Sequence, residues 1–206
     1  MLFARIPGIG KLIYGDALFR IKESGKKAVY LTFDDGPIPE ATPLVLDILK
    51  KYNAKATFFC VGENVTNNQA IFKRIKDEGH SIGNHTYNHV NGWETVNNLY
   101  FENVSGCAKV LKSNLFRPPY GRIKYSQYKA LKKKYKIVLW DVLSMDYSSK
   151  MTSEQCLAII KAKTRAGSII VLHDSLKSAS KLPTLLPGTL DFFKKNGFEM
   201  EPLPTA

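Results

Sequence analysis

The ten residues AVYLTFDDGP, at positions 28–37, decide the fold of this chain. Residues 28–33 are β-branched, aromatic or small apolar, and predict a strand buried on both faces. Asp34 and Asp35 follow this strand directly, and Gly36–Pro37 then turns the chain sharply. The strand therefore ends in two carboxylates at its carboxyl end.

Strand patterns and helix patterns alternate along the rest of the chain. We expect strands at residues 28–33, 55–61, 80–84, 115–117, 136–142 and 168–172, and a short seventh strand at 198–203. We expect helices at residues 39–52, 69–78, 93–112, 126–134 and 185–195, and one more that opens at Thr152 with Gln155 three residues later as a capping pair. This alternation predicts a parallel sheet covered by helices.

Two architectures fit such a sheet: an open doubly wound sheet and a barrel. Reactive side chains stand at the carboxyl ends of at least five expected strands, at Asp34–Asp35, His85, Arg117, Asp141 and His173. An open sheet brings few strand ends to one crevice, whereas a barrel lets many converge on one point. We therefore predict an α/β fold, a distorted (β/α) barrel of seven strands.

Length and composition indicate one globular domain. The 206 residues are 44% hydrophobic and 23% charged, so we expect a single domain over 1–206, with residues 1–25 as an N-terminal extension packing on it. No apolar run reaches the about 20 residues of a transmembrane helix. No signal-peptide pattern is visible at the start. The expected location is cytoplasmic, or the periplasm or cell envelope if a leader has been removed.

The three cysteines, Cys60, Cys107 and Cys156, are too few and too widely spaced for a disulfide framework or a cysteine zinc site. Lys and Arg number 30 against 18 Asp and Glu, a net charge of +12. One interpretation is a solvated basic surface, and the other is attraction to an anionic polymer or membrane surface. No nucleic-acid recognition motif accompanies the charge, so we expect no nucleic-acid partner. The oligomeric state is left open.

The segment HTYNH, residues 85–89, predicts a metal site. Two histidines at i and i+4 share one helix face and can bind one ion. With one carboxylate they match the ligands of hydrolytic zinc sites, which leave a position for water. Zinc proteases place Glu directly after the first His, where this chain has Thr86. The base must come from elsewhere, and Asp34 is the candidate, since neighbouring strand residues point in opposite directions and so take different tasks.

Two further strand ends carry residues suited to catalysis. Arg117, in the segment RPPYG, is placed to pair with Asp34, and the amide of Tyr120 after the two prolines is a free donor for an oxyanion. His173, at the end of an apolar strand, is placed as a general acid. Trp140 and Tyr147 either form an aromatic wall for a sugar or, for Trp140, pack in the core.

The ordered set TFDDGP, HTYNH, RPPYG, WDVLSMDY and VLHD, from Thr32 to Asp174, resembles the NodB-like polysaccharide deacetylases, carbohydrate esterase family four. The resemblance implies a NodB-type barrel that hydrolyses N-acetyl, or less often O-acetyl, groups on a glycan such as peptidoglycan or a chitin-type oligosaccharide. It also implies a divalent metal, usually zinc, with cobalt, nickel or manganese as alternatives.

Carried over residue by residue, the resemblance makes Asp34 the base, His173 the acid, Arg117 the residue that orients the base, and the Tyr120 amide an oxyanion donor. It makes Asp35, His85 and His89 the metal ligands. The expected substrate contacts are Pro119, Tyr120, Trp140, Tyr147 and Leu172.

The chain departs from the family pattern in its fourth and fifth motifs. Many members have a carboxylate three residues before Asp146 that supports the catalytic histidine, and this chain has Leu143 there. We expect His173 to be supported either by Asp141, two residues earlier on the same strand face, or by no carboxylate. Val171 stands where Leu is common, a mild change in the lining of the pocket. The alternative to an enzyme is a non-catalytic glycan- or cell-wall-binding domain that has retained the fold.

Overall fold

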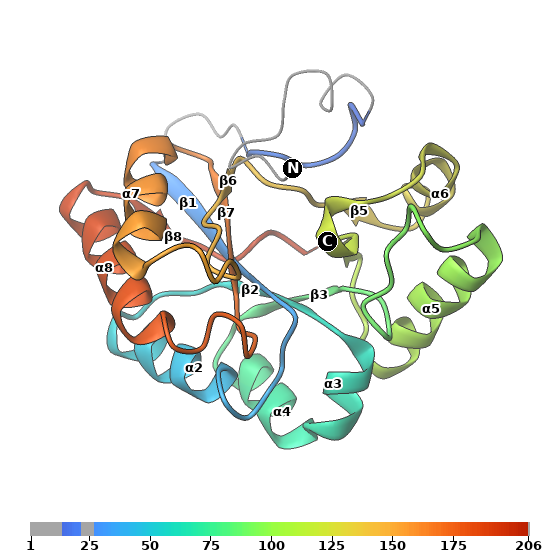
Figure 1. Ribbon diagram of the computed structural model, residues 1–206, viewed down its shortest axis with the longest axis horizontal. Coiled ribbons are helices and arrows are strands. Elements are labelled where there is room, and N and C mark those ends of the chain that lie inside the picture. The colour runs from blue at the N-terminus through green and yellow to red at the C-terminus, as the bar shows by residue number, and fades with distance from the viewer. Residues whose placement is uncertain (1–13, 22–26, 206) are drawn as a thin grey trace.

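The computed structural model describes residues 14–21 and 27–205 (Figure 1). Its sheet runs in the order β5-β4-β3-β2-β1-β7-β6, and every recorded pairing of these strands is parallel. The strands are β1 (Ala28–Asp34), β2 (Thr57–Cys60), β3 (Ser81–Asn84), β4 (Leu115–Phe116), β5 (Lys136–Ile137), β6 (Val142–Leu143) and β7 (Ile169–His173). A short strand, β8 (Glu199–Met200), also pairs with β1.

The two ends of this strand order, β5 and β6, are separated in the chain by only residues 138–141. Each extended residue spans at most about 3.6 Å, so the sheet must curl until its edges nearly meet. The amide of Val138 donates to the carbonyl of Phe116 on β4 at 2.8 Å, and that of Asp141 donates to the carbonyl of Ile169 on β7 at 3.0 Å. The distorted barrel is therefore confirmed. The prediction of a single strand at 136–142 is wrong. Within these residues the chain leaves β5 at one edge of the sheet and enters β6 at the other.

A short N-terminal stretch lies along this seam. Leu18 forms a parallel bridge with Val138, and Arg20 forms an antiparallel bridge with Ser168, the residue before β7. The Tyr14 hydroxyl donates to the carbonyl of Ile123 at 2.8 Å. These contacts belong to residues 14–21 of the expected extension, whereas residues 1–13 and 22–25 lie outside the described residues.

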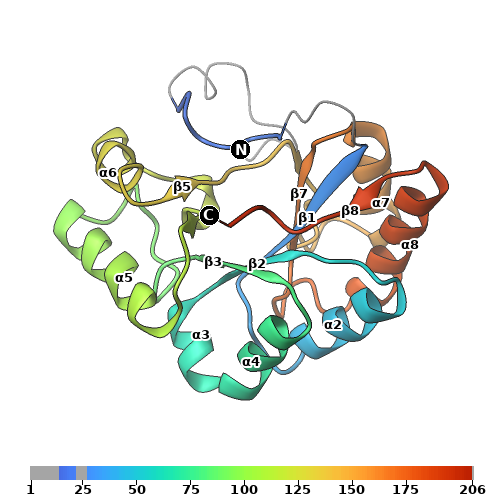
Figure 2. The same cartoon turned by 180° about the vertical axis from the view of Figure 1, so that it is seen from behind.

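Helices surround the strands on the outside (Figures 1 and 2). They are α2 (Thr42–Lys51), α3 (Gly62–Asn67), α4 (Gln69–Asp77), α5 (Asn97–Val110), α6 (Tyr125–Leu131), α7 (Ser153–Lys163) and α8 (Leu182–Lys195), with a 3₁₀ turn η1 (Pro119–Gly121). Helix α3 was not among the helices predicted from the sequence. The capping pair at the start of α7 is confirmed, since the Thr152 hydroxyl accepts from the Gln155 amide and the Gln155 side chain accepts from the Thr152 amide.

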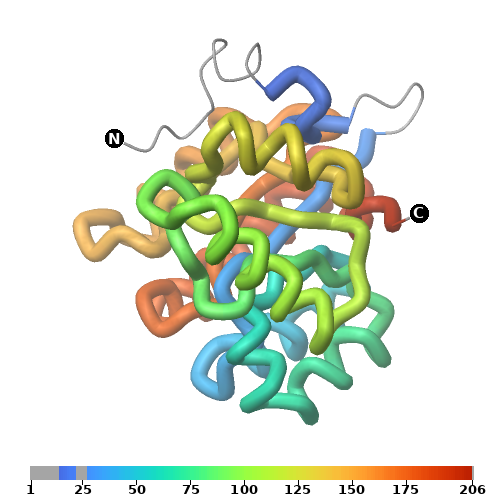
Figure 3. Tube along the Cα trace, turned by 90° about the vertical axis from the view of Figure 1, so that its right-hand side faces the viewer, coloured from blue at the N-terminus to red at the C-terminus, as the bar shows by residue number. Residues whose placement is uncertain are grey.

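Strand β1 is buried along its whole length, and its two faces meet different neighbours. Leu31 and Phe33 pack in the large cluster that includes the buried faces of α2 and α8. Tyr30 points the other way and packs with Phe59 and Ile169. In the strand order β1 is an interior strand, with β2 and β7 on its two sides. In Figure 3 the loops after β6 (orange) and β7 (red-orange) project from one side of the molecule, opposite the C-terminus.

We expect two glycine-to-alanine substitutions to have opposite effects on stability. A Cβ on Gly83 would lie 2.4 Å from ring carbons of Phe59, and that ring is held in place by the Arg117 guanidinium 4.0 Å from its centroid. Gly83→Ala should lower the free energy of unfolding by about 1–3 kcal/mol, as overpacked cores do. In α5 a Cβ on Gly106 would meet atoms no closer than 3.6 Å. Gly106→Ala should be neutral or stabilise by up to about 1 kcal/mol.

Urea unfolding of the two variants and the parent chain measures both effects. Equal stability of the two variants would contradict the packing described for Phe59.

Candidate metal centre and active site

A cavity of about 420 Å³ opens at the carboxyl ends of the strands. Eight of the residues singled out in the sequence line it: Asp34, Asp35, His85, His89, Tyr120, Trp140, Tyr147 and His173. The other lining residues are Ile38, Asn64, Gly121, Leu143, Val171, Ser175, Leu176 and Lys177. The barrel therefore gathers in one place side chains that are up to about 140 positions apart in the chain.

Three of these side chains form a cluster suited to one metal ion. One ligand atom from each of Asp35, His85 and His89 lies within 4.8 Å of the others. The Oδ1 atom of Asp35 is 3.1 Å from Nε2 of His89 and 3.8 Å from Nε2 of His85. Two imidazoles and a carboxylate with an open side are the donor set of hydrolytic zinc sites.

The tautomer of His85 suits metal binding. Its Nδ1 lies 2.8 Å from the carbonyl oxygen of Arg117, and because a carbonyl only accepts, Nδ1 carries the proton. The lone pair is then on Nε2, which faces Asp35. Burial lowers the pKa of His85 to about 4, so the ring is neutral near pH 7, as a metal ligand must be. The residues present therefore fit a divalent cation.

The two histidines meet through a loop and not through a helix. Residues 85–90 have no helical structure, and the backbones of Thr86 and His89 have φ angles of 63° and 55°. The Thr86 amide donates to the Asn84 side chain and the Thr86 hydroxyl accepts from the amide of Val90, so the loop is bonded on both sides. The rings still approach to 5.0 Å between centroids. The shared helix face expected from the spacing is wrong.

Asp34 and Asp35 both line the cavity, although neighbours in a strand would face opposite ways. Strand β1 ends at Asp34, and Asp35 has a φ angle of 88°, which turns its side chain back to the same side. The next residue, Gly36, donates its amide to the buried carboxyl of Asp174 at 3.1 Å. Burial raises the pKa of Asp35, but its hydrogen bond to His89 and the nearby histidine charges outweigh this and hold the pKa well below its usual range.

Arg117 pairs with Asp34, as expected from the sequence. Its guanidinium is fully buried, and Nη1 donates to Asp34 at 2.6 Å and to the Thr32 hydroxyl at 2.8 Å. A buried guanidinium needs a partner charge and several acceptors, and this one also donates to the carbonyls of Val138 and Leu139. The Asp34 carboxylate is thereby fixed in position at the cavity wall.

The turn after the two prolines presents Tyr120 to the cavity. Tyr120 has a φ angle of 59°, and its hydroxyl lies 3.2 Å from Nδ1 of His89. Among the described residues, the hydrogen bonds that close this turn use the amides of Gly121 and Arg122 and not that of Tyr120. That amide has the environment expected of an oxyanion donor.

Asp146, and not Asp141, supports His173. The Asp146 carboxylate accepts from the His173 backbone amide at 2.8 Å and lies 2.7 Å from Nδ1 of its ring. Asp141 instead accepts from Arg165 at 2.8 Å and from the Ser168 hydroxyl at 2.8 Å. The expected substitution by Asp141 is therefore wrong. Leu143 removes no support from His173, because the carboxylate that reaches the ring comes from the loop beyond β6.

The pKa of His173 follows from this pairing. Burial alone lowers it, but the charge and hydrogen bond of Asp146, with the charges of Asp35 and Asp34, outweigh burial and raise the pKa to about 9. The ring is therefore protonated near pH 7, and its Nδ1 is bonded to Asp146. His173 pairs in register with Asp34 across β7 and β1, so a proton donor and a carboxylate stand at neighbouring strand ends.

The expected substrate contacts divide into two groups. Tyr120, Trp140 and Tyr147 line the cavity, and the Tyr147 ring packs edge-on against His173 at 5.1 Å. Pro119 is buried and is not among the lining residues. Leu172 is wrong as a contact, because it is fully buried in the core cluster beneath the helices. Alternate residues of β7 face opposite ways, so Val171 lines the cavity with His173.

Val171 was expected in the lining of the pocket, and it lines the cavity. Other lining residues were not anticipated. Asn64 lies on helix α3, which the sequence did not predict, and its side-chain amide donates to the Asp35 carbonyl at 2.7 Å. Leu176 and Lys177 follow His173 in a loop that carries no motif.

We expect Asp146→Asn to lower the pKa of His173 from about 9, because the substitution removes the Asp146 charge and leaves the burial in place. Asp141→Asn is the matched control and should leave that pKa unchanged, since its carboxylate bonds Arg165 and Ser168. The chain has four histidines, so an NMR titration resolves each ring. Equal shifts in the two variants would contradict the assigned support.

Comparison with known proteins agrees with this geometry. The family model described as polysaccharide deacetylase matches residues 21–138. Two peptidoglycan-N-acetylglucosamine deacetylases of Bacillus cereus are 38% identical over 157 residues and 35% identical over 183 residues. The alignments cover 73% and 85% of this chain, and 57% and 85% of the two relatives, so the chain spans little more than half of the first.

A solved structure has the same fold over nearly the whole chain. It is the crystal structure of a peptidoglycan N-acetylglucosamine deacetylase in complex with 4-naphthalen-1-yl-N-oxidanyl-benzamide. It superposes with a TM-score of 0.83 at 31% identity, and the match covers 97% of this chain and 96% of that one. Together with the match to the family model, this similarity establishes that the chain belongs to the polysaccharide deacetylase family.

Proposed function

We propose that this protein is a divalent-metal-dependent hydrolase that removes N-acetyl groups from amino sugars of a glycan, such as peptidoglycan or a chitin-type oligosaccharide. The observation that carries the proposal is the single cavity in which a fixed carboxylate, a protonated imidazole and a three-ligand metal cluster face one another. The names of the relatives support the substrate class, since they are deacetylases of peptidoglycan and of chitooligosaccharides.

Asp35, His85 and His89 are the proposed metal ligands, and zinc is the proposed ion, with cobalt, nickel or manganese as alternatives. When bound, such an ion supplies Lewis-acid polarisation of the acetyl carbonyl and lowers the pKa of water.

Asp34 acts as the general base in this proposal. The bond to Arg117 leaves Asp34 no freedom to swing away from the cavity, and its second carboxylate oxygen is available to take a proton from the attacking water. Water adds to the acetyl carbonyl carbon, and the backbone amide of Tyr120 donates to the oxygen on which negative charge develops.

His173 completes the reaction as the general acid. Its Nδ1 is bonded to Asp146, so the proton on Nε2 is the one to be transferred. Transfer to the amide nitrogen allows the carbon–nitrogen bond to break, and the products are acetate and a free amino sugar. Trp140 and Tyr147 form the proposed wall against which the sugar packs.

The alternative, a non-catalytic glycan-binding domain, is disfavoured by the condition of the site. Such a domain has no use for a histidine held protonated by Asp146 beside a cluster of metal-ligating side chains, yet this arrangement is present. The cost of burying these charges is accounted for by catalysis.

Among the residues that the structure describes, no helix is both long and apolar enough to cross a bilayer. Two predictions stay open to test. One is the single domain with an N-terminal extension, and the other is the attraction of the basic surface to anionic partners.

We expect His85→Ala to abolish metal binding and acetate release together. Loss of several kcal/mol of transition-state stabilisation corresponds to a fall in kcat/KM of about 10³-fold or more. His80→Gln is the control. His80 lies in a separate pocket, so this variant should still bind one equivalent of metal. Metal analysis and acetate release, with and without chelator, measure both. Full activity in the metal-free variant would refute the ligand assignment.

We expect the rate to fall as pH rises through about 9, because His173 loses there the proton that it must donate. Asp146→Asn should move this basic limb of the kcat/KM profile to lower pH, since the pKa of His173 falls when the charge that raises it is removed. A basic limb that stays in place in this variant would argue against His173 as the acid.

A further inference from the structure

Trp93 is an exposed tryptophan on a rigid loop. Its side chain is 57% exposed, although large aromatic side chains are usually covered. The indole Nε1 donates to the carbonyl of Ile123 at 3.2 Å, and the Trp93 amide donates to the Asn91 side chain at 3.1 Å. The ring is therefore anchored at its polar edge.

The loop that carries Trp93 is bonded to the segment that leads into α6. The Gln127 side chain donates to the carbonyls of Gly92 and Thr95 at 3.0 Å and 3.2 Å, and Lys124 donates to Thr95 at 2.9 Å. A Cβ on Gly92 would lie 2.5 Å from the Arg122 carbonyl, so the two segments are in close contact. A rigidly held surface ring loses little entropy when a ligand binds.

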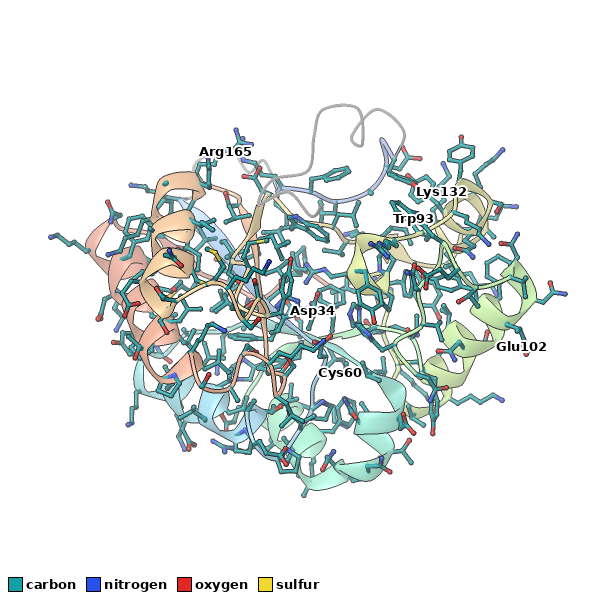
Figure 4. All side chains as sticks on the ribbon, viewed as in Figure 1. Asp34, Cys60, Trp93, Glu102, Lys132 and Arg165 are labelled. Carbon is teal, nitrogen blue, oxygen red and sulfur yellow. The ribbon has the colours of Figure 1, made fainter. Side chains whose placement is uncertain are left out.

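A row of side chains connects Trp93 to the metal cluster. The ring of the proposed ligand His89 lies 4.6 Å from that of Tyr120, which lines the cavity. The Arg122 guanidinium lies 6.0 Å from the Tyr120 ring and 5.2 Å from the Trp93 ring. The centroids of the Tyr120 and Trp93 rings are thus separated by no more than the sum of these two distances. Figure 4 labels Asp34 near the centre of the molecule and Trp93 toward the side where α5 and α6 lie.

We propose that Trp93 and Arg122 form a second sugar-binding site outside the cavity, which holds another sugar of the same N-acetylated glycan chain. The proposal rests on the proposed function, because it places the acetyl group to be removed at the metal cluster. It makes the substrate an oligosaccharide or polymer, and it makes Trp93 a residue that selects for chain length.

The chemistry of the row fits a sugar. A pyranose has one face of C–H groups, which packs on an aromatic ring, and a rim of hydroxyl and carbonyl oxygens, which accept hydrogen bonds. Trp93 offers the ring, and Arg122 offers several N–H donors beside it. The Glu94 carboxylate, 3.6 Å from Arg122 and largely exposed, adds an acceptor for sugar hydroxyls. A single exposed aromatic residue is ordinary. Trp93, however, is connected to the reaction cavity through the Arg122 guanidinium, and this arrangement indicates a ligand-binding surface.

The kinetic test uses Trp93→Ala with two substrates. Tetra-N-acetylchitotetraose reaches beyond the cavity, whereas 4-nitrophenyl acetate fits within it. We expect kcat/KM for the tetrasaccharide to fall about tenfold through KM, with kcat unchanged, because Trp93 binds the substrate and the transition state equally. Hydrolysis of 4-nitrophenyl acetate should be unchanged. Leu99→Ala removes an apolar side chain of similar exposure, 58%. It should leave kcat/KM unchanged for both substrates.

An unchanged kcat/KM for the tetrasaccharide, or an equal loss with both substrates, would overturn the proposal. If the parent protein hydrolyses neither substrate, the proposed function is refuted. The sugar-binding site is then tested by the fluorescence measurement of binding alone.

The binding test uses fluorescence. The chain has two tryptophans and Trp140 is buried, so the emission that Trp93→Ala loses relative to the parent protein is that of Trp93. We expect tetra-N-acetylchitotetraose to protect Trp93 from quenching by acrylamide, in the presence and absence of metal. N-acetylglucosamine, which occupies the cavity alone, should not protect it. Unprotected Trp93 at saturating tetrasaccharide, or no binding of the tetrasaccharide at all, overturns the assignment.

Discussion

The buried ion pair between Arg117 and Asp34 is the interaction on which the rest of this structure depends. The guanidinium is fully buried and contacts three parts of the barrel: Asp34 and Thr32 on β1, the carbonyls of Val138 and Leu139 in the seam, and the face of Phe59 on β2. Its own backbone carbonyl accepts from His85 and so fixes the tautomer of a proposed metal ligand. Removal of one member of such a buried pair typically costs about 3–5 kcal/mol. Here it would also loosen the barrel seam, the base and the metal cluster at once.

Which residues come together at the site was easier to predict from the sequence than the backbone conformation at those residues. Asp34, His85 and His173 were placed correctly at one rim, with Arg117 bonded to Asp34 behind it, because parallel strands in a barrel bring their carboxyl ends together. The backbone between motifs was not predictable in the same way. Asp35, Thr86, His89 and Tyr120 all have positive φ angles, which non-glycine residues seldom adopt and which no residue pattern announces. Such conformations are stable only because the surrounding tertiary contacts hold them.

Two errors at the site have different causes. Asp141 was assigned to His173 from its strand face, yet Asp141 lies at the barrel seam, where it bonds Arg165 and Ser168. Leu172 was carried over from the family pattern, although the strand period assigns Val171 to the cavity. The second error was avoidable from the period alone. The first was not, because the expected strand at 136–142 divides between two sheet edges, which only the closed barrel reveals.

The position of β1 inside the sheet has a consequence for the order of events on the ribosome. Its partners are β2, which follows it closely, and β7, which is made only after residue 168. Until then one edge of a largely apolar strand has unpaired backbone groups, and such edges promote association between nascent chains. A chain released early, at residue 138 where the family match ends, would contain the whole metal cluster but lack β6, β7 and the histidine opposite Asp34. Completion of the barrel and assembly of the proton donor are therefore one and the same late step.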